Sequence, residues 1–488
     1  MDHTCVMDCV LAIDQGSHAS RALLFDAHGG VIARHEAGVD QREPHPGWVE
    51  LAPEQVLETV RAVIGEVLPK ARGPVRCAGL AVQRSTLVAW HRDSGKALAP
   101  ALSWQDTRCR DLLRAFAPHE KRIHGVTGLP VSPHYLAGKM RWLLDHHEAV
   151  ARAHAKGALV MGPLASYLAW HLLEGHPLIA DHSNAARSLL FDLGRLQWSP
   201  DLAALFRIDP DLLPACVPTL ADHGVLAGTA IPLTCLCGDQ NAAIHAGGEP
   251  PEDQALLNLG TGAFLLRDAG ETPPAPDHLL GGIAWSTAGA RRYLLEGTVN
   301  GVGSAIRWLQ QQTDTDILGG LPGWLREIRD APLFVNSIGG LGSPYWRQDV
   351  EARFIPATQS AARRAVAVID SIAFLVRRNL EEMHPDSLRA IQVSGGLSRL
   401  DGLCQRISDL AGLPVRRHED PEATARGVAW LAANRPAHWR RSSPGSTFCP
   451  VNNVRLKQRY GEFVDLLERD PGLVSPPCLN GPGSGSRC

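Results

Sequence analysis

The chain has 488 residues, of which 44% are hydrophobic and 20% charged, and its formal net charge is −3. This length predicts two to four domains with cores of their own, and the composition excludes wholesale disorder. A nearly neutral charge without long basic runs argues against nucleic acid as the main partner. No lysine lies between Lys156 and Lys457, which restricts the ways in which this stretch can bind phosphate.

Compartment and membrane association follow from the first residues and from the longest uncharged stretch. Asp2 and Asp8 stand where a secretory signal needs positive charge, so we expect no signal peptide. The 11 cysteines include no CxxC pair, which favours reduced thiols. Residues 157–173 fall short of the ~20 apolar residues that span a bilayer, and they predict a buried strand or turn leading into a core helix. We expect a cytoplasmic protein without membrane insertion.

Two distant stretches show the same succession of apolar runs and turns. In the first, residues 10–13, 22–25 and 31–33 predict an antiparallel meander, followed by a helix over 54–68 and a strand over 78–82. In the second, residues 255–266 predict two strands around a Gly-Thr-Gly turn, and a helix over 361–383 and a strand over 390–393 follow. The repetition predicts two similar α/β domains.

The predicted domains are divided near 247–253, a Gly/Pro-containing segment that we interpret as a hinge. We place the N-terminal domain at 8–248 and the C-terminal domain at 249–468. Residues 470–488 are rich in Pro, Gly and Ser, and they predict a disordered tail.

Three turns that follow apolar strands are candidate phosphate sites. In the turn from Asp14 to His18, backbone N–H groups can bind an anion, and an acid at its start can hold a phosphate-bound Mg²⁺. An ordinary hairpin capped by its Asp is an equally good explanation of this turn alone. Gly260-Thr261-Gly262 and Gly395-Gly396 are the other two turns. Each is weak evidence by itself, but their order within the repeated pattern favours nucleotide binding.

A lysine-based phosphate loop is excluded. The pattern GxxxxGK[ST] is absent, since Ala97 follows Gly95-Lys96 and Met140 follows Gly138-Lys139. This excludes P-loop NTPases and protein kinases built on a strand lysine. Nucleotide binding would have to use backbone amides, hydroxyls, arginine and metal.

Several motifs, in this order, resemble those of the FGGY carbohydrate kinases, with the glycerol kinase branch nearest. The resemblance runs from about residue 9 to about residue 468. It rests on Asp14-Gln15-Gly16-Ser17, Pro46-Gly47-Trp48-Val49-Glu50, Val82-Gln83-Arg84, Ser103-Trp104-Gln105-Asp106, part of a signature at Lys139-Met140-Arg141-Trp142-Leu143, Ser183-Asn184-Ala185-Ala186-Arg187, Gly238-Asp239-Gln240, Gly260-Thr261-Gly262 and Gly339-Gly340-Leu341-Gly342-Ser343-Pro344-Tyr345-Trp346.

The resemblance implies two actin-like (ribonuclease-H-like) domains around a cleft. It implies transfer of the γ-phosphoryl group of ATP to a hydroxyl of a small carbohydrate or polyol, with Mg²⁺. It involves no nucleic acid and no membrane, and a homodimer is left open. Domain closure would exclude water and so favour transfer over hydrolysis.

The resemblance also assigns the nucleotide and catalytic residues. Asp239 matches the general base, although an Asp that caps the next helix is the simpler explanation outside this family. Asp14 and Asp239 match the metal-facing acids. Residues that match the ATP site are Asp14, Gly16, Ser17, His18, Arg21, Gly260, Thr261, Gly303, Arg307, Gly395 and Gly396. Arg307 and Leu400 stand where glycerol kinases have Gln and Asn, and His18 and Ala19 where hydroxyl residues are usual.

On the acceptor side the matching residues combine hydrogen-bonding groups with an aromatic wall. They are Arg84, Ser85, Trp104, His134, Asp239, Gln240 and Phe264. Ser85 replaces a glutamate of glycerol kinases, and His134 aligns with their substrate tyrosine, although a shift of one residue would place Tyr135 there. The loss of a carboxylate makes the site less selective and opens room. We therefore expect a larger polyol or a sugar.

Three alternatives remain at this stage. Glycerol kinase proper is one, and a degenerate kinase fold kept as a ligand-binding or regulatory protein is another. The third is an actin-like ATPase without a small substrate, which the group of Arg84, Trp104 and Gln240 disfavours.

Overall fold

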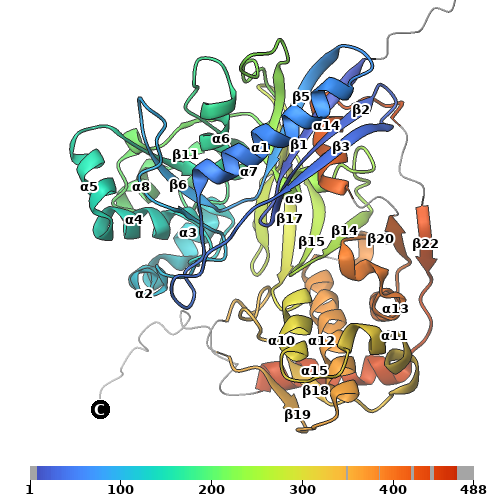
Figure 1. Ribbon diagram of the computed structural model, residues 1–488. Coiled ribbons are helices and arrows are strands. Elements are labelled where there is room, and N and C mark those ends of the chain that lie inside the picture. Colours follow the sequence, from blue (N-terminus) through green and yellow to red (C-terminus); the bar gives the residue numbers. More distant parts are fainter. Residues whose placement is uncertain (1–7, 348–349, 384, 419–421, 440–443, 470–488) are drawn as a thin grey trace, which may run out of the picture.

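The computed structural model describes residues 8–347, 350–383, 385–418, 422–439 and 444–469 (Figure 1). The predicted tail over 470–488 lies outside these residues. Within the described part of the chain, no helix combines the length and the apolar character that crossing a membrane requires.

The N-terminal half is built on a five-stranded sheet with the order β13-β5-β1-β2-β3. Its strands are β1 (Cys9–Gln15), β2 (Ala19–Asp26), β3 (Val31–Gly38), β5 (Val75–Val82) and β13 (Leu233–Gly238). The first three strands form the predicted antiparallel meander, and β5 pairs parallel with both β1 and β13. Since β1 is buried throughout, both faces of this sheet must be covered.

Helix α1 (Pro53–Val67) covers one face of this sheet. Its buried residues recur every three or four positions, at Val56, Leu57, Val60, Val63 and Val67, so that one apolar stripe faces the sheet. Pro53 is tolerated because the first helical N–H has no partner within the helix. The stripe packs on alternate sheet residues, among them Leu11 and Ile13.

The C-terminal half repeats this plan in a seven-stranded sheet with the order β16-β17-β15-β14-β20-β21-β22. The strands are β14 (Gln254–Leu259), β15 (Ala263–Gly270), β16 (Leu280–Ser286), β17 (Arg291–Val299), β20 (Ala390–Ser394), β21 (Val415–His418) and β22 (Pro444–Phe448). β14, β15, β17 and β16 pair antiparallel in that spatial order, and β20 and β21 extend the sheet in parallel. The long helix α12 (Ala361–Glu382) precedes β20 as α1 precedes β5. The predicted duplication of an α/β unit is confirmed.

Further elements extend the two halves. The N-terminal half carries a second sheet, β4 (Glu50–Leu51), β7 (Ala101–Leu102), β6 (Leu87–His91) and β8 (Leu159–Pro163), in that order. Its further helices are α2 (Arg110–Leu113), α3 (Glu120–Thr127), α4 (Leu136–His146), α5 (Glu148–Ala155), α6 (Leu164–Leu172), α7 (His182–Ala185), α8 (Pro200–Phe206) and α9 (Asp239–Ala243). Strand β8 leads directly into the buried helix α6, as predicted for 157–173.

Short ribbons and four more helices complete the described chain. The ribbons pair β9 (Ile179–Asp181) with β12 (Ala215–Val217), β10 (Phe191–Asp192) with β11 (Gln197–Trp198), and β18 (Leu333–Val335) with β19 (Arg353–Ile355). The helices are α10 (Gly303–Gln310), α11 (Ile317–Glu327), α13 (Asp401–Ala411) and α15 (Val454–Arg469). In Figure 1, α10, α11, α12 and α15 gather at the end of the molecule away from α1.

The chain returns to the N-terminal sheet near its end. Helix α14 (Ala423–Ala432) packs on the face of that sheet opposite α1, where Val428 and Ala429 share a buried cluster with Val10 and Ala12 (Figure 1). Gly427 permits the approach of α14 to α9, because a Cβ there would lie 1.8 Å from the carbonyl oxygen of Ala242. The predicted boundary at 248/249 therefore separates the two halves along the sequence. In the folded structure, however, α14 from the second half packs on the sheet of the first half.

Candidate active site

The predicted site residues lie where the strands of the two sheets end. β1, β5 and β13 run parallel, so their carboxyl ends meet at one edge of the first sheet. Asp14 lies near the end of β1, Arg84 follows β5, and Asp239 begins α9 directly after β13. The end of β14 supplies Gly260 and Thr261 from the second sheet. The fold thus collects residues that are far apart in the sequence.

Asp239 is positioned by its helix and by an arginine. Its Oδ1 accepts a hydrogen bond of 2.7 Å from the backbone N–H of Gln240 and lies 3.7 Å from Nε of Arg84. Burial raises the pKa of Asp239, while the Arg84 guanidinium opposes that rise. Helix α9 begins at Asp239 itself, with Gly238 as its N-cap residue and no side-chain cap, so the expected cap by Asp239 is not formed and its hydrogen bond to Gln240 lies within the first turn.

Asp14 is a second acid beside Asp239. Its side chain is 10% exposed, and Oδ2 lies 3.6 Å from Nη1 of Arg21. Burial, followed by repulsion from the Asp239 charge, raises the pKa of Asp14 to about 7, with Arg21 opposing. A nearby cation would stabilise the ionised form of this carboxylate.

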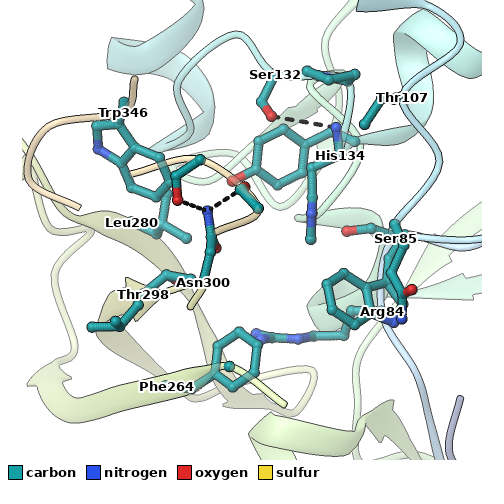
Figure 2. Close-up of a pocket in the computed structure, with 18 of the residues that line it drawn as sticks. Arg84, Ser85, Thr107, Ser132, His134, Phe264, Leu280, Thr298, Asn300 and Trp346 are labelled. Carbon is teal, nitrogen blue, oxygen red and sulfur yellow. Dashed lines mark hydrogen bonds between the residues drawn. The ribbon is translucent and has the colours of Figure 1, made fainter. Parts of the chain in front are cut away.

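A cavity of about 510 Å³ opens between the two halves. Asp14 and Asp239 are not among its lining residues; Asp239 lies behind Arg84, which does line it, at 3.7 Å. Figure 2 shows Arg84, Ser85 and His134 on one side, and Phe264 and Asn300 on the other. The predicted residues that line it are Arg84, Ser85, Trp104, His134, Thr261 and Phe264; further lining residues are Gln105, Thr107, Arg110, Ser132, Pro133, Tyr135, Arg187, Gly262, Leu280, Glu296, Thr298, Val299, Asn300, Ser304, Ser337, Gly339, Gly340 and Trp346. Both His134 and Tyr135 face the cavity, so either register supplies it with a polar ring.

Trp104 connects the cavity to the first phosphate turn. Its Nε1 donates a hydrogen bond of 2.8 Å to Oγ of Ser17, and its ring lies 5.2 Å from that of His134. Burial and the nearby charge of Lys139 hold the pKa of His134 well below its usual value. His134 is therefore a neutral ring that can accept or donate one hydrogen bond to a substrate hydroxyl.

Gln240 and the remaining residues of the first turn lie outside the cavity lining. The Oε1 of Gln240 accepts a hydrogen bond of 3.3 Å from Nδ2 of Asn258, which turns it toward β14. Arg21 also donates to Glu36, at 2.6 Å. His18 is exposed, and Gly16 closes the hairpin through a backbone hydrogen bond to Ala19.

The glycine turns of the second half meet around the end of β14. The backbone N–H of Gly303, at the start of α10, donates to the carbonyl of Gly260 at 3.1 Å, and Ser304 Oγ donates to that of Thr261 at 3.2 Å. Gly395 has φ +89°, and a Cβ there would lie 2.5 Å from the carbonyl oxygen of Leu259. Beside it, Gly396 faces open space, as a surface for a flat ligand requires. Arg307 lies exposed on α10, and Leu400 packs against the C-terminal core.

The acids present suit magnesium with phosphate better than a metal held by protein alone. Among the described residues there is no group of three or more His, Cys, Asp or Glu side chains that could hold a metal ion. Mg²⁺ commonly takes one or two carboxylates and completes its shell with phosphate oxygens and water. Asp14 and Asp239 fit that requirement.

Three charged residues of the cavity lining were not predicted as site residues, namely Arg110, Arg187 and Glu296. Glu296 of β17 accepts hydrogen bonds from Arg84 and Arg187. Arg187 ends a quoted motif, which is a signal that could have been followed. Glu296 gives a weaker signal, a single carboxylate in a strand that also contains Arg291, Arg292 and Thr298.

Comparison with known proteins identifies the class. The N-terminal domain of the FGGY family of carbohydrate kinases matches residues 9–244, and the C-terminal domain of that family matches residues 255–434. The chain therefore belongs to the FGGY family of carbohydrate kinases. It is an ATP-dependent phosphotransferase that acts on an alcohol group of a polyol or sugar.

The relatives that match nearly the whole chain include glycerol kinases. The glycerol kinase of Alkalilimnicola ehrlichii is 35% identical, with 96% of this chain and 99% of that protein covered. That of Aquifex aeolicus is 31% identical, with 95% and 99% covered. Among solved structures, Plasmodium falciparum glycerol kinase with ADP has a TM-score of 0.84 at 24% identity, covering 95% and 98%. A xylulose-type kinase from Brucella ovis has 0.82 at 22%, covering 94% and 98%. These confirm the predicted family and two-domain fold.

Proposed function

We propose that Asp239 is the general base of this kinase and that its acceptor is a polyol or sugar larger than glycerol. The observation that carries the proposal is the cavity of about 510 Å³ lined by Ser85 and by Arg84, whose Nε lies 3.7 Å from Oδ1 of Asp239. At the ~30 Å³ that one water takes in the liquid, a triol of six heavy atoms occupies roughly 180 Å³. The cavity therefore has room for a longer carbon chain.

The residues around the cavity have complementary tasks in this mechanism. Arg84 donates hydrogen bonds to acceptor hydroxyls, and Trp104 and Phe264 contact the carbon skeleton. Asp239 orients the reacting hydroxyl and accepts its proton as the oxygen attacks the γ-phosphorus of ATP. The Thr261 hydroxyl and the glycine turns around it contact the phosphates. Mg²⁺ at Asp14 would neutralise phosphate charge when bound.

We also propose that the protein works in the cytoplasm. Cys77, Cys109, Cys235, Cys237 and Cys404 are buried thiols. Cys235 and Cys237 have their sulfur atoms 3.8 Å apart without a disulfide. Buried thiols of this kind favour a reducing compartment.

The substrate is tested by measuring ADP release with glycerol, erythritol, xylulose and ribulose under the same conditions. We expect a four- or five-carbon acceptor to give the highest kcat/KM. A preference for glycerol would show that the argument from Ser85 and the cavity is wrong.

The base is tested with Asp239→Asn and the best acceptor of that panel. We expect turnover to fall by about 10³-fold or more while ATP binding, measured by calorimetry, stays within about threefold. Asp222→Asn is the matched control, because Asp222 is an exposed carboxylate that also accepts a backbone N–H. Full activity of Asp239→Asn would overturn the assignment.

A further inference from the structure

A single buried carboxylate joins two arginines across the cavity. Glu296 accepts hydrogen bonds of 2.7 and 3.1 Å from the two Nη atoms of Arg84, and one of 2.5 Å from Arg187. The three side chains are 2%, 8% and 3% exposed. Glu296 belongs to β17 of the second sheet, whereas both arginines come from the N-terminal half. The contact therefore spans the two halves of the cleft.

The charges of this group are unequal. Two guanidinium groups share one buried carboxylate, so the three side chains together carry one net positive charge. Burial opposes ionisation of Glu296, yet Arg187 and Arg84 hold its pKa below the usual value. The next anion along is Asp239, 3.7 Å from Nε of Arg84. Arg84 is thus held between Glu296 on its Nη side and Asp239 on its Nε side.

We propose that Glu296 is a positioning residue that keeps Arg84 turned to the acceptor and away from a close pair with Asp239. The proposal rests on the proposed function of Asp239 and Arg84. Glu296 touches neither Asp239 nor the reacting atoms; it acts through the arginine. Because it comes from the other half of the molecule, the arrangement is complete only when both halves are in place.

Removing the Glu296 charge has a defined electrostatic consequence. Arg84 would keep Asn241, 3.5 Å from Nη1, and the Asp239 carboxylate as its neighbours. An arginine that turns toward Asp239 no longer presents its donors to the acceptor.

The test compares kcat and the two KM values of Glu296→Gln with those of the unaltered protein. We expect the KM for the acceptor to rise about tenfold or more, while the KM for ATP stays within about twofold and kcat changes less than the acceptor KM.

Asp268→Asn is the matched control for loss of a buried carboxylate in the same sheet. Asp268 pairs with Arg292 of β17 at 2.6 Å and does not line the cavity. It should leave both KM values unchanged. An acceptor KM of Glu296→Gln equal to that of the unaltered protein would overturn the proposal.

Glu296→Asp provides the second variant, should Glu296→Gln not fold. It keeps the charge on a side chain that is too short for the same two-atom contact with Arg84, so the acceptor KM should still rise while the KM for ATP does not. An unchanged acceptor KM would contradict the proposal. Failure of the underlying mechanism is separately visible, since Asp239→Asn would then retain turnover.

Discussion

Asp14 lies where a carboxyl group is costly to ionise. Its pKa is about 7 in the folded protein against an ordinary value of 3.8, chiefly because of burial. Between these two values the folded chain binds more protons at this site than the unfolded chain does. The free energy of unfolding therefore falls as the pH rises from about 4 to 7, and stays reduced above 7.

Substitution of Asp14 should remove this penalty. We expect Asp14→Asn to raise the Tm by about 3 °C or more at pH 8 and to have a much smaller effect at pH 5, where the carboxyl is largely protonated in the folded state. Activity should be lost at both pH values, because the metal-facing acid is gone. Thermal denaturation at the two pH values checks this. An equal change in Tm at both would contradict the burial argument.

Sequence reasoning finds some residues of the cavity and misses others for a physical reason. Arg84 and Trp104 stand in local motifs, where neighbouring residues reveal their chemistry. Glu296 pairs with Arg84, 212 residues away in the sequence, and with Arg187, 109 residues away. The sequence shows a charged residue within a strand but not which residues the fold will bring beside it. Residue spacing along the chain therefore cannot predict long-range ion pairs of this kind.

At the level of elements, helix α4 fixes three loops of the cavity through one side chain. Lys139 is fully buried, and its Nζ donates hydrogen bonds to the carbonyl oxygens of Ser85, Ser103 and His134 at 2.8, 2.7 and 2.8 Å. An ammonium group has three donors, and all three are used. These carbonyls belong to the segments that carry Ser85, Trp104 and His134 into the cavity.

Lys139→Met should loosen the acceptor side and leave the nucleotide side intact. Buried carbonyls without donors cost on the order of 3 kcal/mol or more in total, so the Tm should fall by about 5 °C or more. The acceptor KM should rise several-fold, while the KM for ATP is unchanged. Lys156→Met, at an exposed position after α5, serves as the control. An unchanged acceptor KM would show that the loops hold their places without Lys139.

The repeated meanders and the helices beside them were predicted because their apolar periodicity is strong. Strands β4 and β7 have two residues each, too few to show any period, and they form by pairing with neighbours brought in by the fold. The second sheet of the N-terminal half was therefore absent from the prediction. It carries part of the acceptor side of the cavity, since β7 precedes Trp104 and β6 follows Ser85.

At the scale of the whole molecule, the cavity lies between two halves joined near 247–253. Phosphoryl transfer is protected from hydrolysis when such a cleft closes on both substrates. We expect the radius of gyration to fall when a non-hydrolysable ATP analogue and the acceptor are both present, and to change less with the analogue alone. Small-angle scattering measures this directly. Equal radii with and without both ligands would count against closure.

The position of α14 has a consequence for how the protein is made. Its residues, 423–432, cover the face of the first sheet that carries Val10, Ala12, Phe25 and Ala81. During synthesis that face stays bare until more than four-fifths of the chain has left the ribosome. The N-terminal half therefore cannot complete its core as soon as it is translated, although domains commonly fold in the order of synthesis. A chain that ends at the hinge would expose this apolar surface to other chains. Helix α14 covers the surface only after residues 423–432 have been made.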